Sequence, residues 1–264
     1  MPTFSCPHRA RLQPLADNYD RIARFYDVDM ARNMAFDDVG FYAELCRATP
    51  GPVLELGCGN GRILLELVAR GLDVTGVDGS HRMLAALIGK AAARGWAPPP
   101  VARMDVRALG LRGGFAVVLC PYSLVTYMSG HGDAARLVGE ARRVVVDGGA
   151  VVVDAFVPRP ASATAEFRQD YTRSLADGTL VRSKRVTPLS PAINRIERRY
   201  DVLNASGRLV RRVETSEDIR PFAPDEITAL LEEGGLRVRS TAWDYGAAPS
   251  RDGAQYFTAV AQAG

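Results

Sequence analysis

Cysteine is scarce in this chain, and its few copies stand far apart. The four cysteines among the 264 residues are Cys6, Cys46, Cys58 and Cys120. No two of them form a C-x-x-C pair, and no histidine lies near them at a metal-ligand spacing. Disulfide scaffolds and zinc sites both depend on such clustering. We therefore expect neither a disulfide framework nor a bound metal.

Long apolar runs are also missing. No stretch approaches the roughly 18 apolar residues that a membrane-spanning helix requires. The N-terminal segment contains no apolar core of the secretory type. We therefore expect a cytoplasmic protein without membrane contact. The content of 47% apolar and 24% charged residues is that of a globular protein, and 264 residues suffice for one α/β unit with an insertion.

Lysine is nearly absent, although the chain is slightly basic. Of the 33 basic residues only Lys90 and Lys184 are lysines, which leaves 31 arginines. The net charge of +3 is too small to predict a nucleic-acid partner. With so much alanine, glycine and valine, the arginines fit a coding bias. An arginine site for a phosphate or carboxylate on a substrate stays open as the alternative.

The N-terminal part predicts two helices after a loose arm at residues 1–16, which holds three prolines. The first helix is expected from Asp17 onward, and the second over residues 36–48, where Thr-Pro-Gly-Pro ends it. One face of the first helix collects Tyr19, Ile22, Phe25 and Tyr26.

Short apolar segments then alternate with helical ones, which predicts βαβ units and a parallel sheet. The expected strands are 52–56, 72–77, 100–104, 115–120 and 150–156, and the expected helices are 61–70, 80–94 and 131–145.

Beyond Pro158 the pattern changes to strand-like alternation rich in arginine. Residues 158–222 predict an antiparallel insertion, with a turn at Asn204-Ala205-Ser206-Gly207. A helix opened by Pro224 and two further strands close the chain.

The stretch VLELGCGNGR at 53–62 is a strand that runs into a glycine loop. Such a loop brings backbone N–H groups and a helix N-terminus against a nucleotide-like ligand. A dinucleotide site requires G-x-G-x-x-G, and Arg62 occupies the slot of its third glycine. The Glu55 carboxylate would repel the negatively charged pyrophosphate of a dinucleotide, whereas it would attract a positively charged ammonium group of a ligand. Asp78 follows the next strand, where a carboxylate accepts the ribose hydroxyls of either kind of cofactor.

These landmarks resemble the class I S-adenosylmethionine-dependent methyltransferases. The likeness rests on E-L-G-C-G-N-G, on V-D-G-S, on Asp105 in ARMDVRAL, and on VVDGGAVVVDAF, and it covers about residues 53–157. It implies a doubly wound α/β fold with a seven-stranded, mostly parallel Rossmann-like sheet and S-adenosylmethionine as cofactor. The expected donor-contacting residues are Tyr26, Glu55, Gly57, Cys58, Gly59, Asp78, Gly79, Met83, Asp105, Val106 and Cys120.

Outside the core, the chain resembles the small-molecule branch, in particular the dTDP-aminosugar N-methyltransferases. The segment Y-D-R-I-A-R-F-Y-D is similar to their helical lid, and R-P-F-A-P-D-E-I to their entry into the last helix. The resemblance implies methylation of N or O of a small metabolite, typical of antibiotic biosynthesis, in a possible homo-oligomer. It divides the chain into a lid (1–50), a donor-binding core (51–157), an insertion over the acceptor (158–222) and a closing segment (223–264).

The segment C-P-Y-S-L-V-T-Y-M at 120–128 runs toward the acceptor. RNA, DNA and protein amino-methylating enzymes carry [DNS]-P-P-[YF] here. This chain has Cys120-Pro121-Tyr122, one proline short and without the polar first residue, so that class is only the runner-up. Pyrimidine C5-methyltransferases use a Pro-Cys nucleophile in this loop, whereas Cys120 precedes its proline. A buried thiol at the end of a strand is therefore the better interpretation of Cys120. A tyrosine with a pKa of ~10 is a poor base at neutral pH, so we expect Tyr127 to orient the nucleophile rather than deprotonate it. The alternative is that its ring only packs under the lid. His131 is the candidate general base. A donor-binding protein without catalysis remains the third possibility.

Overall fold

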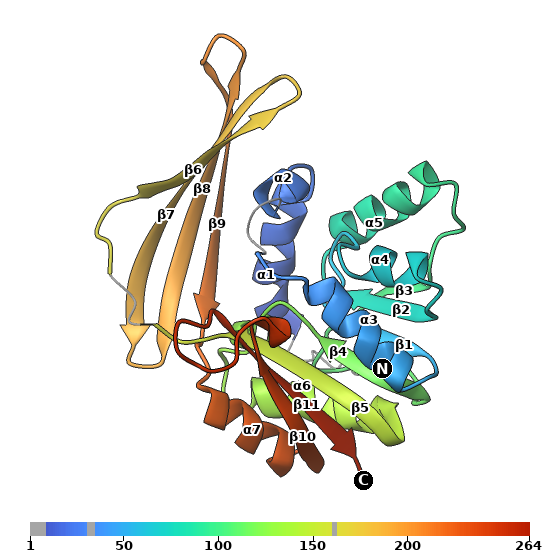
Figure 1. Cartoon of the computed structure of the whole chain (residues 1–264). Helices are drawn as coiled ribbons and strands as arrows, with labels where there is room; N and C mark the ends of the chain where they lie inside the picture. The colour runs from blue at the N-terminus through green and yellow to red at the C-terminus, as the bar shows by residue number, and fades with distance from the viewer. Residues whose placement is uncertain (1–8, 31–34, 160–162) are drawn as a thin grey trace, which may run out of the picture.

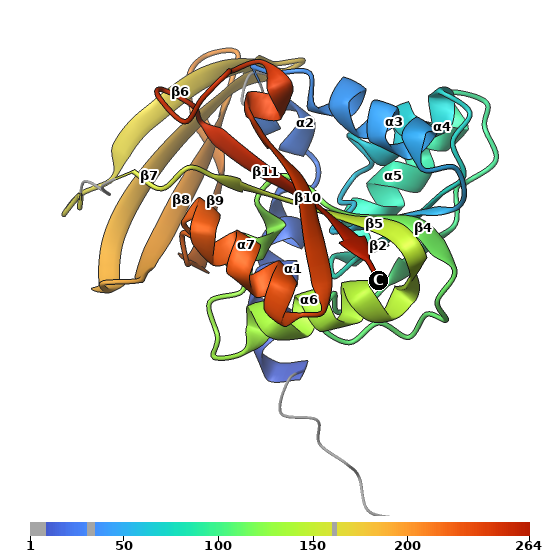
Figure 2. The same cartoon turned by 60° about the horizontal axis from the view of Figure 1, so that its bottom comes forward.

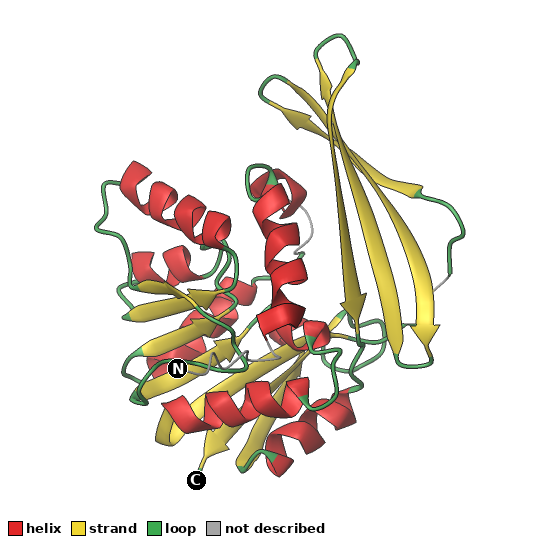
Figure 3. Cartoon of the chain, turned by 180° about the vertical axis from the view of Figure 1, so that it is seen from behind, coloured by secondary structure: helices red, strands yellow, loops and turns green. Residues whose placement is uncertain are grey.

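The computed structural model describes residues 9–30, 35–159 and 163–264 and consists of a core, a projecting sheet and two N-terminal helices, for which we keep the name lid (Figure 1). The core is a twisted sheet with helices on both faces. An antiparallel sheet extends away from it, and two N-terminal helices lie between the two sheets in both the front and the back view (Figures 1 and 3). In these described ranges, no helix is long and apolar enough to span a membrane.

The central sheet confirms the predicted seven-stranded, mostly parallel fold. Within the described residues its strand order is β10-β11-β5-β4-β1-β2-β3, and only β11 runs antiparallel to its neighbours. Every residue of β1 is buried, because the parallel strands are covered on both faces. The strands are β1 (Val53–Leu56), β2 (Val74–Asp78), β3 (Val101–Arg103), β4 (Phe115–Cys120), β5 (Val145–Phe156), β10 (Leu236–Trp243) and β11 (Tyr256–Ala263).

Helices cover both faces of this sheet (Figure 2), and two layers of buried apolar side chains attach them to it. Leu137, Ile227 and Leu231 pack on one face, and Tyr42, Leu64 and Leu87 pack on the other. One face thus carries α6 (Asp133–Val144) and α7 (Pro224–Glu233), and the other carries α3 (Asp38–Ala48), α4 (Leu64–Ala69) and α5 (His81–Ala93). The helix expected from residue 61 begins at Leu64 because the preceding residues form the turn of the glycine loop.

The predicted insertion is an antiparallel sheet of β6 (Arg168–Leu175), β7 (Gly178–Ser190), β8 (Ile193–Asn204) and β9 (Leu209–Ile219). Strand β6 was not predicted, since its sequence RQDYTRSL has little apolar alternation. Arginines on the outer face form cross-strand ion pairs with carboxylates. These pairs are Arg185–Glu197, Arg195–Asp218, Arg199–Glu214 and Arg212–Asp201.

The N-terminal helices differ from the prediction. Helix α1 (Arg9–Ile22) begins within the expected arm and includes Pro14, while residues 1–8 lie outside the described residues. A turn then separates α1 from α2 (Tyr26–Met30), so the expected single helix is broken. Tertiary contacts hold the second half of α1, because packing stabilises helices more than local propensity does. The Asn18 amide donates to the Ser216 carbonyl of β9 at 2.7 Å, and the Ser80 hydroxyl that caps α5 donates to Asp20 at 2.5 Å.

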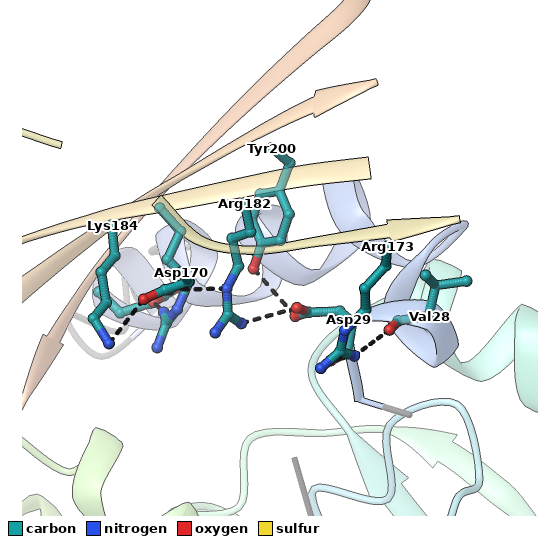
Figure 4. A network of polar contacts seen from close by, with 9 residues as sticks. Val28, Asp29, Asp170, Arg173, Arg182, Lys184 and Tyr200 are labelled. Atoms are coloured by element: carbon teal, nitrogen blue, oxygen red, sulfur yellow. Dashed lines mark hydrogen bonds and ion pairs between the residues drawn. The ribbon is translucent and has the colours of Figure 1, made fainter. Parts of the chain in front are cut away.

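Helix α2 is tied to the insertion sheet by a network of polar contacts around the buried Asp29 (Figure 4). The Asp29 carboxylate accepts from Arg182 at 2.8 Å and from the Tyr200 hydroxyl at 3.3 Å. Arg182 also bonds Asp170, and Arg173 donates to the Asp29 carbonyl. Asp29 is 4% exposed, so the sheet supplies the charge that compensates its burial.

We expect Arg182→Met to destabilise the fold by about 3 kcal/mol, because it leaves the buried Asp29 carboxylate without its main cation. The matched control is Arg185→Met, which removes an ion pair from the outer face of the same strand and costs about 1 kcal/mol or less. Urea unfolding of both variants measures the difference. Equal losses of unfolding free energy would contradict this assignment.

Candidate functional site

The glycine loop crosses the carboxyl ends of β1 and β2 in a conformation that side chains oppose. Gly57, Gly59 and Gly61 have φ values of 70°, 54° and 84°. A Cβ on Gly61 would lie 2.7 Å from Leu87 and 2.9 Å from Leu65. The loop is therefore restricted to glycine by its backbone angles and, at Gly61, also by close packing.

A cavity lies over this loop, and its wall comes from the lid, the ends of β1 and β2, α5, the segment after β4, and the residues Met104 and Val106. Ten residues predicted from the sequence line it. They are Tyr26, Glu55, Gly57, Cys58, Gly59, Asp78, Gly79, Met83, Val106 and Tyr127.

Asp78 stands at the end of β2 and holds two loops together. Its carboxylate accepts from the Gly59 N–H at 2.9 Å and from the Ser80 N–H at 2.8 Å. Burial raises its pKa, and the backbone donors act in the opposite direction. Each oxygen retains further lone pairs, so the carboxylate can also accept from a ligand hydroxyl.

Glu55 lies at the base of the cavity with one oxygen that lacks a partner. It is 2% exposed, and Oε2 has no hydrogen bond within the described chain. Burial raises the pKa of this carboxyl to about 8, while Arg62 acts to lower it. The Arg62 guanidinium is itself engaged by Asp38, at 2.6 and 3.0 Å. A buried acceptor without a partner is costly, and it favours a ligand that brings a donor.

Tyrosines form another part of the cavity wall. The Tyr19 and Tyr127 hydroxyls are 2.8 Å apart, and the Tyr19 ring meets Tyr26 and Tyr127 edge-on at 6.0 and 6.3 Å. Burial is the main cause that raises the pKa of Tyr19, Tyr26 and Tyr127, and it raises that of Tyr122 to about 12. These phenols are therefore neutral at physiological pH, and they offer hydrogen bonds and ring faces rather than charge.

Three predicted residues do not line the cavity. Asp105 is occupied by Arg107, whose backbone N–H and guanidinium both donate to it. Cys120 is buried at the end of β4, where burial raises its thiol pKa. His131 lines a separate groove together with Arg220.

The cavity also contains residues that sequence reasoning did not select. Asn60 and Arg62 belong to the loop itself, and Tyr122 follows the proline after β4. The signal for Arg62 was its place in the third-glycine slot, which served only as an argument against a dinucleotide. The sequence signal at Tyr122 was limited to its position in the amino-methylation motif.

Residues 53–149 match the family model described as "Methyltransferase domain". The chain is also 30% identical over 138 residues to the putative methyltransferase YqeM of Bacillus subtilis. That match covers 52% of this chain and 54% of YqeM, so the chain spans about half the length of this curated relative.

Solved structures share the fold over nearly the whole chain. An S-adenosylmethionine-dependent methyltransferase from Clostridium acetobutylicum has a TM-score of 0.77 at 17% identity, covering 93% of this chain and 99% of its own. The sugar N-methyltransferase KedS8 from a Streptoalloteichus species has a TM-score of 0.68 at 24% identity, covering 90% and 92%. Residues 53–149 are therefore similar in sequence to a methyltransferase domain, and the chain shares the fold of these solved structures over nearly its whole length.

Proposed function

We propose that this protein transfers a methyl group from S-adenosylmethionine to N or O of a small metabolite, with an amine nitrogen as the favoured acceptor. The observation that carries the proposal is the single cavity that joins the glycine loop, Glu55 and Asp78 to a tyrosine-lined wall. The methyltransferase match over residues 53–149 and the likeness to a sugar N-methyltransferase support the same chemistry.

The residues present fit the methyl donor. Glu55 offers an unpartnered oxygen to the ammonium group of the methionine part. Asp78 offers acceptor lone pairs to the ribose hydroxyls. Met83, Met104 and Val106 give apolar surface for the adenine. We assign these residues to donor binding. Asp105 pairs with Arg107, so we assign it a supporting role only.

The bound donor supplies a methyl carbon that its sulfonium has already activated toward displacement. The chain must then align the acceptor and exclude water. Tyr19 and Tyr127 place hydroxyls at the cavity wall, where they can hold a nucleophile in line. Aromatic rings also tolerate the positive charge that develops on a methylated amine.

An amine fits this wall better than an alcohol because it needs no strong base. A neutral amine attacks directly, whereas an alcohol needs help to lose its proton. The phenols with raised pKa values are poor bases. His131, the candidate base, lies in the separate groove and is left out of the proposed mechanism. We assign Tyr127 an orienting role.

The experiment that tests this function is incubation with methyl-labelled donor and separate panels of aminosugar nucleotides, simple amines, phenols, carboxylates and tRNA. We expect label in amines. Label in RNA or protein would support the runner-up class instead. Donor binding without transfer to any panel would indicate a protein that only binds S-adenosylmethionine.

We expect Asp78→Ala to weaken S-adenosylhomocysteine binding by about tenfold to a hundredfold, since charge-assisted hydrogen bonds are lost. Isothermal titration calorimetry measures the affinity. Asp73→Ala is the control, because Asp73 is exposed and precedes the opposite end of β2. An unchanged affinity in Asp78→Ala would remove this residue from the donor site.

Donor binding should depend on pH through Glu55. With a pKa of about 8 the free carboxyl holds its proton at pH 7. A bound ammonium group favours the carboxylate and lowers this pKa, so binding releases about one proton, and affinity rises as pH increases from 6 toward 8. Calorimetry in buffers of different ionisation enthalpy counts the protons. Glu55→Gln should abolish the release, and a wild-type protein that releases none would contradict the assignment.

We expect Tyr127→Phe to lower kcat about threefold to tenfold, the effect of one lost hydrogen bond. The affinity for S-adenosylhomocysteine should change less than kcat does. Tyr19→Phe is the matched variant, because it removes the other hydroxyl of the same pair. Wild-type kinetics in Tyr127→Phe would mean that this ring only packs under the lid.

A further inference from the structure

The chain adopts an unfavourable backbone where it leaves β4 for the donor cavity. Tyr122 and Ser123 have φ values of 54° and 58°. Two successive residues with side chains in the left-handed region are uncommon, and they persist only where the surroundings hold them. The next four residues, Leu124–Tyr127, form the short 3₁₀ helix η1.

Asp154 on β5 meets this turn directly. Its carboxylate accepts from the Tyr122 N–H at 3.0 Å and from the Ser123 N–H at 2.7 Å. The Tyr42 hydroxyl of α3 donates to the same carboxylate. Asp154 is completely buried, so these bonds form without competition from water.

A second bond ties the turn to β5 from the opposite direction. The Ser123 hydroxyl accepts from the Phe156 N–H at 2.8 Å. The Tyr122 ring then rests against the Phe156 and Tyr256 rings, at centroid distances of 5.8 and 6.3 Å. The end of β5 therefore holds the backbone of this turn, and its Phe156 packs against the Tyr122 ring.

The turn carries much of the cavity wall. Pro121, Tyr122, Leu124, Tyr127 and Met128 all line the cavity. A change in φ at Ser123 would move the residues that follow it, and in-line displacement is sensitive to displacements of about 1 Å.

We infer that Asp154 is a positioning residue, which holds Tyr122 and Ser123 in the left-handed conformation and so sets η1 and Tyr127 against the donor cavity. The inference deepens the proposed methyl transfer and rests on it for the kinetic measurements. Asp244 and Tyr245 are a second pair of successive residues with left-handed φ values in the described chain, and they serve as a comparison. Asp244 accepts from the Gln255 and Tyr256 N–H groups, both at 2.8 Å, and has a φ of 48° itself.

The first test compares Asp154→Asn with Asp244→Asn. We expect Asp154→Asn to lower kcat at least about tenfold, because an amide cannot accept from both N–H groups as a carboxylate does, while S-adenosylhomocysteine affinity changes less than about threefold. Asp244→Asn should keep kcat within about twofold at a similar loss of stability in urea. Equal effects of the two variants on kcat would overturn the inference, as would wild-type turnover in Asp154→Asn.

The second test keeps Asp154 and serves also if Asp154→Asn fails to fold. Ser123→Gly and Ser123→Val both remove the hydroxyl, but only glycine accepts a φ of 58° readily. We expect kcat of the glycine variant to exceed that of the valine variant at least about tenfold, with similar donor affinities. Equal turnover numbers would show that the left-handed turn does not matter.

Hydrogen exchange separates this inference from the proposed function. The Tyr122 and Ser123 amides should exchange at least about tenfold faster in Asp154→Asn, whereas the Leu119 amide in β4 should not change. A wild-type protein that binds donor but transfers no methyl group would contradict the function alone. Unchanged exchange at Tyr122 and Ser123 would contradict the positioning role alone.

Discussion

The rest of this site depends on how tightly the chain turns after β1. The positive φ values of Gly57, Gly59 and Gly61 let the backbone cross between the ends of β1 and β2. The Gly57 and Cys58 N–H groups bond the Val77 carbonyl, which joins the loop to the neighbouring strand. As a result, the carboxylates of Glu55 and Asp78 reach one cavity although they stand 23 positions apart along the chain.

The other walls are brought to this loop by charge and hydrogen bonds between distant segments. Asp20 holds α1 to the N-terminus of α5, and Asp29 holds α2 to the insertion through Arg182. The hydroxyls of Tyr19 and Tyr127 then join the lid to the segment after β4. The lid therefore has a partner on each side, and the arginine-rich sheet supplies a cation to the buried Asp29 as well as a solvated outer face.

Much of the fold was predictable because buried parallel strands appear as continuous apolar segments. Strands β1, β2 and β4 lie close to where the sequence placed them, and the insertion has its expected antiparallel form. The errors fall where tertiary contacts override local signals. Helix α1 passes through Pro14, β6 forms from polar residues on the edge of its sheet, and α2 separates from α1.

The sequence by itself determined the glycine loop, Glu55, Asp78 and thus the kind of cofactor to expect, because these positions follow one another along adjacent strands at short spacings. Only the tertiary structure decided the composition of the acceptor wall. Tyr19 meets Tyr127 across 108 residues, and Asp154 meets Ser123 across 31. No local pattern in the sequence indicates such pairs, because their contact results from the order of the strands and the docking of the lid. The same cause placed His131 in another groove and turned Asp105 toward Arg107.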